Sequence, residues 1–484
     1  MTQPTSTAVD ETPAAGPRRL TGQLGVGAIV FMVIAAAAPL TVIGGNVPLA
    51  VAGGNGVGAP VGFLIAATVL LIFSIGFVTM TPHVKEAGAF FSYINTGLGS
   101  RAGLGAAFVA LVAYTAIQVG VYGYMGWAAN DLITYFGGPD IPWWVYSFAT
   151  LAVVGLLGYR HIELSARVLG VALVLEIAIM VALDVAVFVR GGPTGPVWST
   201  FSPHHVLGSG LGVAVLFALT GFIGFEATAV FRDEARTPER TIPRATYLAV
   251  VIIGVFYAVS CWALVTAAGA TDAVAVAQRT LDGDGNMMLD TAHDYLGAAL
   301  RDVMNVLLIS SLFACVLSFH NVLARYMFTL ANKQVLPARL GDTNAKHHAP
   351  SFASVVQTIT AAVVLLALVL VGLDPLVGVF GSMAGVSTVG MVLLMTVTSI
   401  AALVFFSRHP EAAHGRVLPT RVAPAVAVLG LLVCAWLVLS NFTLVTGGSA
   451  GVSTVLALIP VAAFVVGCAL GGRYSLQESS TISE

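Results

Sequence analysis

Two glutamates stand inside long apolar stretches of this 484-residue chain. Glu226 closely follows Gly221 and Gly224, whereas Glu176 lies in a run of Val, Leu, Ile, Ala and Met. A carboxylate in hydrocarbon costs about 3 kcal/mol even on insertion scales, so such residues are candidates for function. We expect both to act in coupling or gating, by taking up a proton or holding a cation. The alternative is structural: Glu226 would tie down loose N–H or hydroxyl groups, and Glu176 would pair with another residue.

Polar side chains near residue 320 form a second candidate group. His320 can change charge near neutral pH and is adjacent to Asn321, which suggests coupling or gating. A hydrogen-bonded packing histidine is the alternative for His320. Ser318 offers a hydroxyl that suits a sodium ion beside carbonyl groups of the first membrane helix. Asp184 lies nearer the outer end of its segment than Glu176, so we expect it to be in water.

Tyr114, Gln118 and Tyr122 recur at four-residue spacing within one apolar segment. Residues four apart share one face of a helix. Gln118 and Tyr122 are therefore candidate side-chain contacts for a bound solute. Packing inside a helix bundle, without contact to any ligand, is the alternative.

A turn rich in Asp and Gly, residues 281–290, matches a calcium loop only in part. Asp282, Asp284 and Asn286 have the required spacing, but Met287 and His293 stand where the loop needs glycine and glutamate. We expect a solvated turn without metal.

The composition predicts that most of the chain's surface faces lipid. Hydrophobic residues make up 57% and charged residues 9%, against about 25% charged in an ordinary soluble domain. Residues 20–84 contain no Asp, Glu, Lys or Arg. The four cysteines all lie in apolar segments and are expected to be buried thiols, not disulfides or metal ligands. No Gly-Lys dipeptide and no cluster of catalytic residue types occurs, so we expect neither a Walker A pump nor an enzyme, and no cofactor.

Apolar windows bounded by polar turns predict twelve membrane crossings. The windows are 25–52, 59–81, 102–136, 142–159, 164–189, 207–231, 245–269, 299–330, 352–372, 375–406, 424–444 and 450–472. Of 21 basic residues, only Arg190, Arg279 and Arg301 fall outside in this arrangement, which places both termini in the cytoplasm. Residues 1–19 and 473–484 are then cytoplasmic tails, the first one disordered.

Two of these crossings contain weak points in their backbone. The first has four alanines followed by a proline, which lacks an N–H donor, at 35–39. The sixth has Gly221 and Gly224 bracketing two apolar residues, and glycine costs a helix interior about 1 kcal/mol relative to alanine. Close helix packing is the alternative use of such glycines. Paired interruptions at matching positions of two halves point to a transporter's central site, where helix ends suit a zwitterion.

Three stretches resemble the amino acid–polyamine–organocation permeases. They are the loop at 82–103, the glycine-broken helix with its acidic, proline-flanked loop at 221–245, and the helix end at 317–337. The resemblance implies an all-α polytopic membrane protein with the LeuT-like fold. Residues 20–190 and 207–406 would be two inverted five-helix repeats, each with a discontinuous first helix. Residues 424–472 would add two further helices.

The resemblance also implies a substrate site between helices one, three, six, eight and ten. Phe222, by its place in the sixth-helix break, would be a gate or apolar lid. We expect substrate contacts from Ala35, Ala36, Ala37, Ala38, Pro39, Gln118, Tyr122, Thr220, Gly221, Phe222, Ile223 and Gly224.

The function expected from these observations is secondary active transport of amino acids across the plasma membrane, as an importer or exchanger that works by alternating access. The alternative within the same fold is a transporter of polyamines or other organic cations; a channel or a transport-derived sensor is less favoured. The coupling ion would be a proton or sodium. The basic cluster Arg232, Arg236, Arg240 and Arg244 is interleaved with acids, so nucleic-acid binding is not expected. The oligomeric state does not follow from the sequence.

Overall fold

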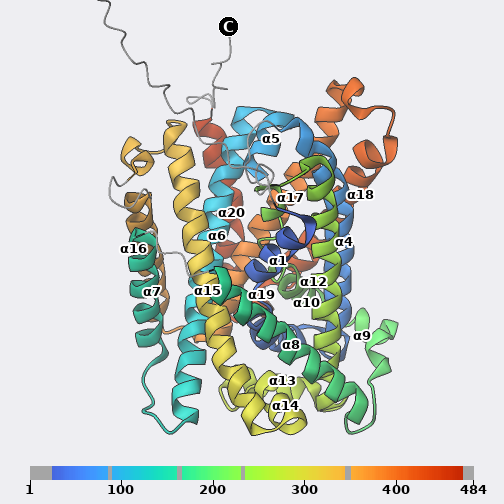
Figure 1. The fold of residues 1–484 in the computed structure, drawn as a ribbon, viewed down its shortest axis with the longest axis vertical. Helices are drawn as coiled ribbons and strands as arrows, with labels where there is room; N and C mark the ends of the chain where they lie inside the picture. Colours follow the sequence, from blue (N-terminus) through green and yellow to red (C-terminus); the bar gives the residue numbers. More distant parts are fainter. Residues whose placement is uncertain (1–23, 85–89, 161–165, 231–234, 344–349, 472–484) are drawn as a thin grey trace, which may run out of the picture.

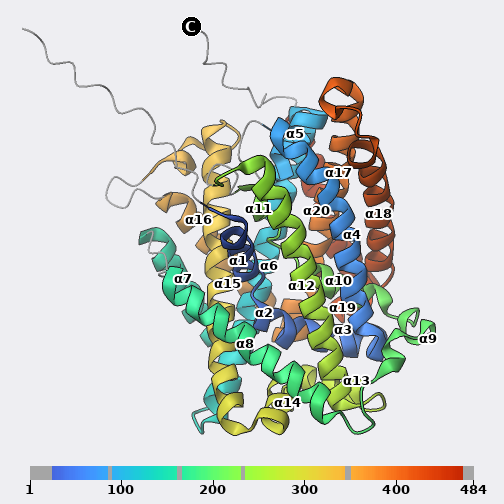
Figure 2. The same ribbon diagram turned by 45° about the vertical axis from the view of Figure 1, so that its right-hand side comes forward.

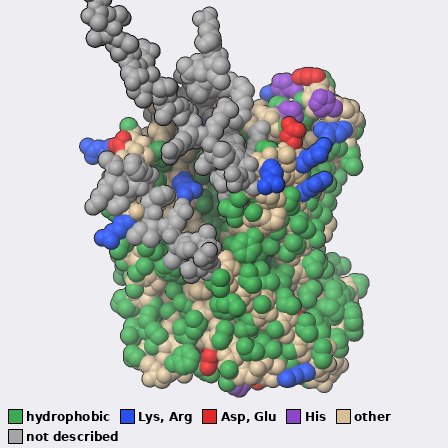
Figure 3. Space-filling view, in the orientation of Figure 1, with side chains coloured by type: hydrophobic (Ala, Val, Ile, Leu, Met, Phe, Trp, Pro, Cys, Tyr) green, Lys and Arg blue, Asp and Glu red, His purple; other side chains and the backbone are tan. Residues whose placement is uncertain are grey.

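The computed structural model describes residues 24–84, 90–160, 166–230, 235–343 and 350–471. The predicted tails, 1–19 and 473–484, lie outside these residues. The described part of the chain is built from helices, most of which stand side by side in one bundle (Figure 1). On the face shown in Figure 3, charged side chains gather toward the two ends and the band between them is apolar.

Nine helical stretches within the described residues are long and apolar enough to cross a membrane. The first, Val26–His83, is 58 residues long and contains the first two predicted crossings. The expected fourth and sixth crossings correspond to α7 (Trp143–Arg160) and to the shorter α10 (Leu211–Thr220). The chain is therefore a multi-pass membrane protein, whereas the count of twelve crossings stays a prediction.

The long helices bury one part of their apolar surface in the bundle and turn another part outward. α6 is mostly buried and packs against α15, α17 and α20, whereas α20 exposes most of its aliphatic side chains. Helices that are apolar on all sides suit a bundle surrounded by lipid. The long helices of the bundle are α4 (Ala59–Met80), α6 (Ser100–Tyr135), α8 (Ala166–Arg190), α12 (Pro238–Ala268), α15 (Ala298–Asn332), α16 (Ser351–Leu370), α17 (Ser382–Arg408), α18 (Ala423–Ser440) and α20 (Ala450–Leu470).

The first crossing is interrupted after α1 (Val26–Ala37). Ala38 has φ 48° and ψ 74°, in the left-handed region, and α2 (Pro39–Thr41) begins directly after it. Pro39 cannot donate a backbone hydrogen bond, so a break here loses one bond fewer than elsewhere. The chain then continues through the π-helical turn η1 (Val42–Asn46) into α3 (Val47–Ala50). The interruption falls within the stretch 35–39 for which unwinding was predicted.

The other interruption follows α10. After Thr220 the chain makes consecutive turns as far as Glu226, and α11 (Ala227–Val230) follows. Gly224 has φ 107°, a conformation that side-chain-bearing residues rarely adopt. The two glycines named in the sequence therefore lie within the interruption itself.

Two short helices cover one end of the bundle. α13 (Ala273–Asp282) and α14 (Met287–Leu296) connect α12 to α15 and lie at the lower end of the molecule in Figures 1 and 2. The turn between them is exposed at Asp282, Gly283 and Asp284, as expected, whereas Asn286 at its end is only 2% exposed and its side chain accepts a hydrogen bond from the Leu289 N–H (3.1 Å). Asn286 is buried because it caps α14, whose first turn packs into the bundle.

Candidate functional site

The two interruptions lie against each other. A Cβ atom placed on Gly224 would be 3.6 Å from the Cβ of Ala36, and one on Gly221 would be 3.0 Å from Val42 Cγ1. The absence of a side chain at Gly221 therefore allows the two interrupted segments to approach most closely there. Their unwound segments bring main-chain N–H and C=O groups into the middle of the bundle, where protein groups must satisfy them.

Tyr257 of α12 connects both interruptions. Its hydroxyl donates to the carbonyl of Ala37 (3.1 Å), the last residue of α1. Its ring packs edge-on against Phe222, with centroids 6.3 Å apart and planes at 73°. Phe222 and Tyr257 are both 1% exposed. The aromatic pair is packed and buried in this conformation, and a role of Phe222 as a gate or lid stays a prediction.

Glu226 accepts hydrogen bonds at the interruption that follows α10. Its carboxylate accepts hydrogen bonds from the Tyr114 hydroxyl on α6 and from the Gly224 N–H (3.0 Å). The side chain is 2% exposed. Tyr326 of α15 packs against Tyr114, with ring centroids 6.4 Å apart. The observed contacts are those of the structural alternative, in which the carboxylate ties down an unpaired N–H and a hydroxyl; a role in coupling stays a prediction.

Glu176 reaches across to the other break. Its carboxylate accepts a hydrogen bond from Ser311 on α15 (2.8 Å) and interacts with the backbone N–H of Leu40 in α2. Thr41 in turn donates to Ser311 (3.4 Å). Within the described residues no ion pair involves Glu176. Each interruption thus has one buried carboxylate at its edge, and neither carboxylate is held by a described cation.

Asp184 is not in water, contrary to expectation. It is 6% exposed, and its Oδ2 accepts a hydrogen bond from Ser260 of α12 (2.7 Å). Its Oδ1 has no hydrogen-bond partner among the described residues. The reason is that α8 turns the face bearing Asp184 toward α12, which hydropathy along one segment does not reveal.

His320 belongs to a buried network that joins three helices. Gln118 of α6 accepts from Gln357 of α16 (2.7 Å), so its NH₂ group faces Tyr122 and His320 Nδ1 (both 3.4 Å). The other nitrogen of His320, Nε2, lies 2.8 Å from the Ser354 hydroxyl. These contacts assign a neutral ring with Nδ1 accepting and Nε2–H donating. Gln118 and Tyr122 share a face, as predicted, and their polar atoms are bound within this network.

The remaining predicted residues lie in different surroundings. Thr220 is 6% exposed and its hydroxyl is 2.6 Å from that of Thr388 on α17. Ser318 is exposed and Asn321 is half-buried. Ser311, two turns before Ser318, is the serine that contacts the first crossing. In the other predicted substrate positions, Ala37, Ala38, Pro39 and Ile223 are buried, and Ala35 and Ala36 are half-buried.

Sequence reasoning missed the partners that hold these residues. Ser311 and Tyr257 stand in apolar runs where nothing distinguishes them from other membrane-helix residues. Tyr326 does lie in the stretch 317–337 that carries a family resemblance, so its place in a motif was an available signal. Pairings across a bundle depend on which helices become neighbours, and a single sequence does not show this.

The fold and this site define a class: a multi-pass membrane protein built around two facing interrupted helices. The chain belongs to the amino acid permease family, whose model matches residues 24–468. The resemblance to amino acid–polyamine–organocation permeases is confirmed. Members of this family are transporters rather than enzymes.

Similar proteins include several transporters. The branched-chain amino acid permease BcaP of Bacillus subtilis is 21% identical over 80% of this chain and 81% of its own length. An uncharacterized transporter of Mycobacterium bovis is 24% identical over 59% of this chain, and the match spans 62% of that protein. The low-affinity putrescine importer PlaP of Escherichia coli is 24% identical over 41% of this chain and 44% of its length.

Proposed function

We propose that this protein is a secondary active transporter of amino acids that works by alternating access in the plasma membrane. The observation that carries the proposal is the pair of facing interruptions, with Gly224 beside Ala36 and Gly221 beside Val42. Discontinuous helices that meet in this way are typical of transporter substrate sites. In this proposal the chain crosses the membrane twelve times, as two inverted five-helix repeats with two added helices, and both termini are cytoplasmic.

The substrate would bind where the two breaks meet. Main-chain N–H groups near Pro39 suit its carboxylate, and carbonyls between Thr220 and Gly224 suit its ammonium group. Phe222 would move to admit the side chain, because it fills this region in the observed conformation. Gln118 and Tyr122 would then support the face of α6 that borders the site, through the network they share with His320.

An amine substrate is the second candidate, and one observation favours it. Glu176 and Glu226 are buried at the edges of the two breaks without a described cationic partner. Two carboxylates would attract an ammonium group in a site of low dielectric. The similarity to a putrescine importer is consistent with this alternative.

Counterflow in proteoliposomes tests the proposal. Vesicles containing the purified protein are loaded with an unlabelled amino acid and diluted into a trace of the labelled one. A transporter gives a transient accumulation that saturates with concentration, whereas a channel gives none. Matched pairs of amino acid and decarboxylated amine, such as ornithine and putrescine, distinguish the two substrate classes. The absence of accumulation for every amino acid and amine would refute the proposed function.

Coupling can be separated from transport with Glu176→Gln. The amide keeps the size of the carboxyl group but cannot take up a proton, so we expect uptake driven by a pH gradient to fall at least tenfold. Counterflow, which needs no ion gradient, should stay within about twofold. Asp374→Asn is a matched control, since Asp374 caps the start of η8 (Pro375–Gly381) by accepting from two backbone N–H groups. Equal losses of both activities in Glu176→Gln would contradict proton coupling through this residue.

A further inference from the structure

Asp184 is a buried carboxyl group that the proposed transport mechanism does not use. It lies on α8, six residues before Arg190 at the end of that helix, which is about 9 Å at the helical rise of 1.5 Å per residue. Its side chain is 6% exposed. Glu176 lies eight residues earlier, about 12 Å away along the same helix, so the two carboxyl groups have separate surroundings. An ionisable side chain in a membrane helix is a candidate for function.

One oxygen of Asp184 is unsatisfied. Oδ2 accepts a hydrogen bond from Ser260 of α12 (2.7 Å), whereas Oδ1 has no partner among the described residues. No ion pair within the described part of the chain involves Asp184. A buried carboxylate without a cation bears the full cost of losing its water, and the neutral acid bears much less. A proton on Oδ1 would therefore remove most of this cost.

The helices around Asp184 supply no compensating charge. α8 packs against α1, α2, α12, α14 and α15. α1 and α2 contain no titratable side chain. Ser260 is the one polar partner of Asp184 among the described residues. The titratable groups in the adjacent parts of α12, α14 and α15 are Tyr257, Cys261, Asp290, His293, Asp294, Tyr295, Arg301, Asp302 and Cys315.

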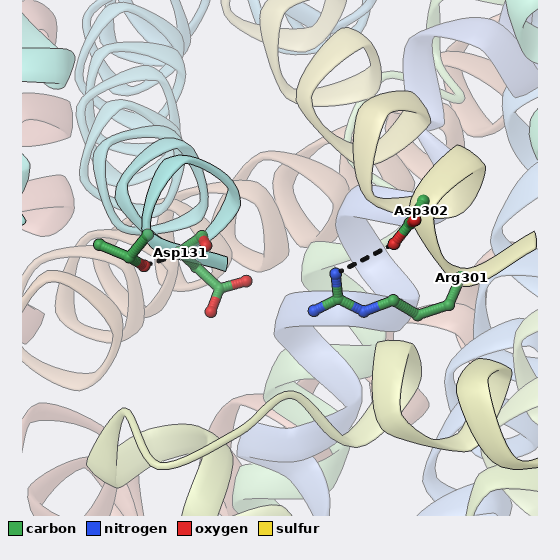
Figure 4. Close-up of polar contacts among 4 residues, drawn as sticks. Asp131, Arg301 and Asp302 are labelled. Atoms are coloured by element: carbon green, nitrogen blue, oxygen red, sulfur yellow. Dashed lines mark hydrogen bonds and ion pairs between the residues drawn. The ribbon is translucent and has the colours of Figure 1, made fainter. Parts of the chain in front are cut away.

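Asp131, near the end of α6, is in the opposite situation. The guanidinium of Arg301 extends from α15 toward Asp131 (Figure 4), and the two groups interact electrostatically. Arg301 Nη1 also lies 3.5 Å from Asp302 Oδ1. The buried cation of α15 is therefore shared by these two aspartates, and Asp184 has none.

Aromatic rings lie between Asp184 and the end of the bundle. Phe188 follows Asp184 by one turn of α8, and Trp262 follows Ser260 by two residues of α12; their ring centroids are 4.8 Å apart. Trp198 packs on the same Trp262 ring, also at 4.8 Å. We call the contact of Asp184 and Phe188 with Ser260 and Trp262 the α8–α12 seam. This seam is closed in the observed conformation.

Tyr257 connects the α8–α12 seam to the two interruptions. It precedes Ser260 by three residues, one turn of α12. Its hydroxyl donates to the Ala37 carbonyl (3.1 Å), and its ring packs against Phe222. A displacement of α12 at Ser260 would therefore move the residue that contacts both breaks.

We propose that Asp184 is a proton-binding site that holds the α8–α12 seam closed. In the closed seam Oδ1 carries the proton and the side chain is neutral. When α8 moves away from α12, water reaches the carboxyl group, the O–H bond breaks and the proton passes to water. Because the closed form binds the proton more tightly, proton binding stabilises the closed seam and proton release favours its opening. The outer location of the seam and its effect on transport rest on the proposed function, whereas proton binding itself does not.

Infrared difference spectroscopy of the purified full-length protein tests proton binding directly. A carboxylic acid has a C=O stretching band that disappears when the group ionises. On raising the pH from about 5 to about 8, we expect the wild type to lose one such band that Asp184→Asn lacks at every pH. Asp374→Asn is the matched control, because Asp374 is exposed and accepts from two backbone N–H groups. It should keep the band.

Ser260→Ala is a second variant, which serves if Asp184→Asn folds poorly. It removes the one donor that stabilises the charged form of Asp184. The band should therefore persist to a pH about one unit higher than in the wild type. An unchanged pH dependence in Ser260→Ala would contradict the assignment of the band to Asp184.

Cysteine labelling in intact cells tests control of the seam. Val187 is fully buried on α8, three residues after Asp184, whereas Asp284 is exposed. With a membrane-impermeant maleimide, the labelling rate of Val187→Cys relative to that of Asp284→Cys should rise at least fivefold from about pH 5 to about pH 8. The reference cysteine corrects for the thiolate fraction, which also rises with pH. Adding Asp184→Asn to both cysteine variants should keep the change in this ratio below twofold.

Three results would overturn the proposal: a labelling ratio that does not depend on pH, an equal rise of the ratio in the Asp184→Asn background, or an infrared band that Asp184→Asn leaves unchanged. Counterflow could still succeed in each case. A protein without counterflow could likewise show the Asp184 band, so failure of this proposal and failure of the transport function are distinguishable.

Discussion

At the scale of single residues, the buried carboxylates are held by neutral donors. Glu226 is bound by a tyrosine hydroxyl and a backbone N–H, and Glu176 by a serine hydroxyl. Neither has an ion-pair partner among the described residues. Such a carboxylate can exchange partners with a substrate ammonium group or a proton without first breaking a buried salt bridge, whose loss would be costly.

Tyr114→Phe isolates the contribution of the Glu226 contact. The change removes one hydroxyl donor and leaves a buried carboxylate oxygen unsatisfied, so we expect a loss of about 1–3 kcal/mol of stability. Tyr326→Phe is the matched control, because the Tyr326 hydroxyl is buried and has no hydrogen-bond partner in the described part of the chain. Thermal unfolding in detergent measures both. A Tyr114→Phe variant as stable as Tyr326→Phe would show that the contact does not hold the break.

At the scale of the element, the first interruption is concentrated at one residue. Ala38 alone takes left-handed angles, while Ala37 is still helical and Pro39 starts the next helix. An alanine in this conformation is strained by about 1–2 kcal/mol. The break is therefore enforced by its surroundings, including the Tyr257 hydroxyl on the Ala37 carbonyl.

Ala38→Gly and Ala37→Gly provide a matched test of this strain. Both variants lose one buried methyl group, but glycine relieves strain at position 38 and weakens the helix at position 37. We expect Ala37→Gly to be less stable than Ala38→Gly by about 2 kcal/mol, from these opposite backbone effects. The Tm values of the two variants, measured in the same detergent, test this expectation. Equal Tm values would argue against strain at Ala38.

Gly158 of α7 determines how closely that helix approaches the His320 network. An added Cβ would lie 2.5 Å from His320 Nε2 and 2.7 Å from the Ser354 hydroxyl. Gly158→Ala should therefore lower Tm, by displacing both side chains. Gly170→Ala is the control, since its nearest neighbour would be at 3.5 Å and alanine favours the helix. The double variant Gly158→Ala/His320→Ala should recover part of the loss; no effect of Gly158→Ala alone would contradict this packing.

At the scale of the whole molecule, the distribution of charge predicts sidedness. The α13–α14 hairpin and the connection around η9 (Pro410–Ala413) belong to opposite sides in the proposed arrangement. Asp284 and Glu411 are exposed residues in these two connections. In intact cells, a membrane-impermeant maleimide should label Asp284→Cys and should label Glu411→Cys only after permeabilisation. The reverse pattern would invert the proposed orientation.

The sequence by itself determined that this is a multi-pass membrane protein of the amino acid permease family, and it indicated where two of its helices break. These features follow from local chemistry: hydrocarbon excludes charge, proline lacks a donor, and glycine accepts unusual angles. Only the tertiary structure decided that Glu176 meets Ser311 and that Asp184 is buried against Ser260. Those contacts join residues far apart in the chain, and they depend on which apolar helix faces become neighbours. Since nearly every face is apolar, hydropathy does not distinguish the face that turns to lipid from the face that turns to a partner.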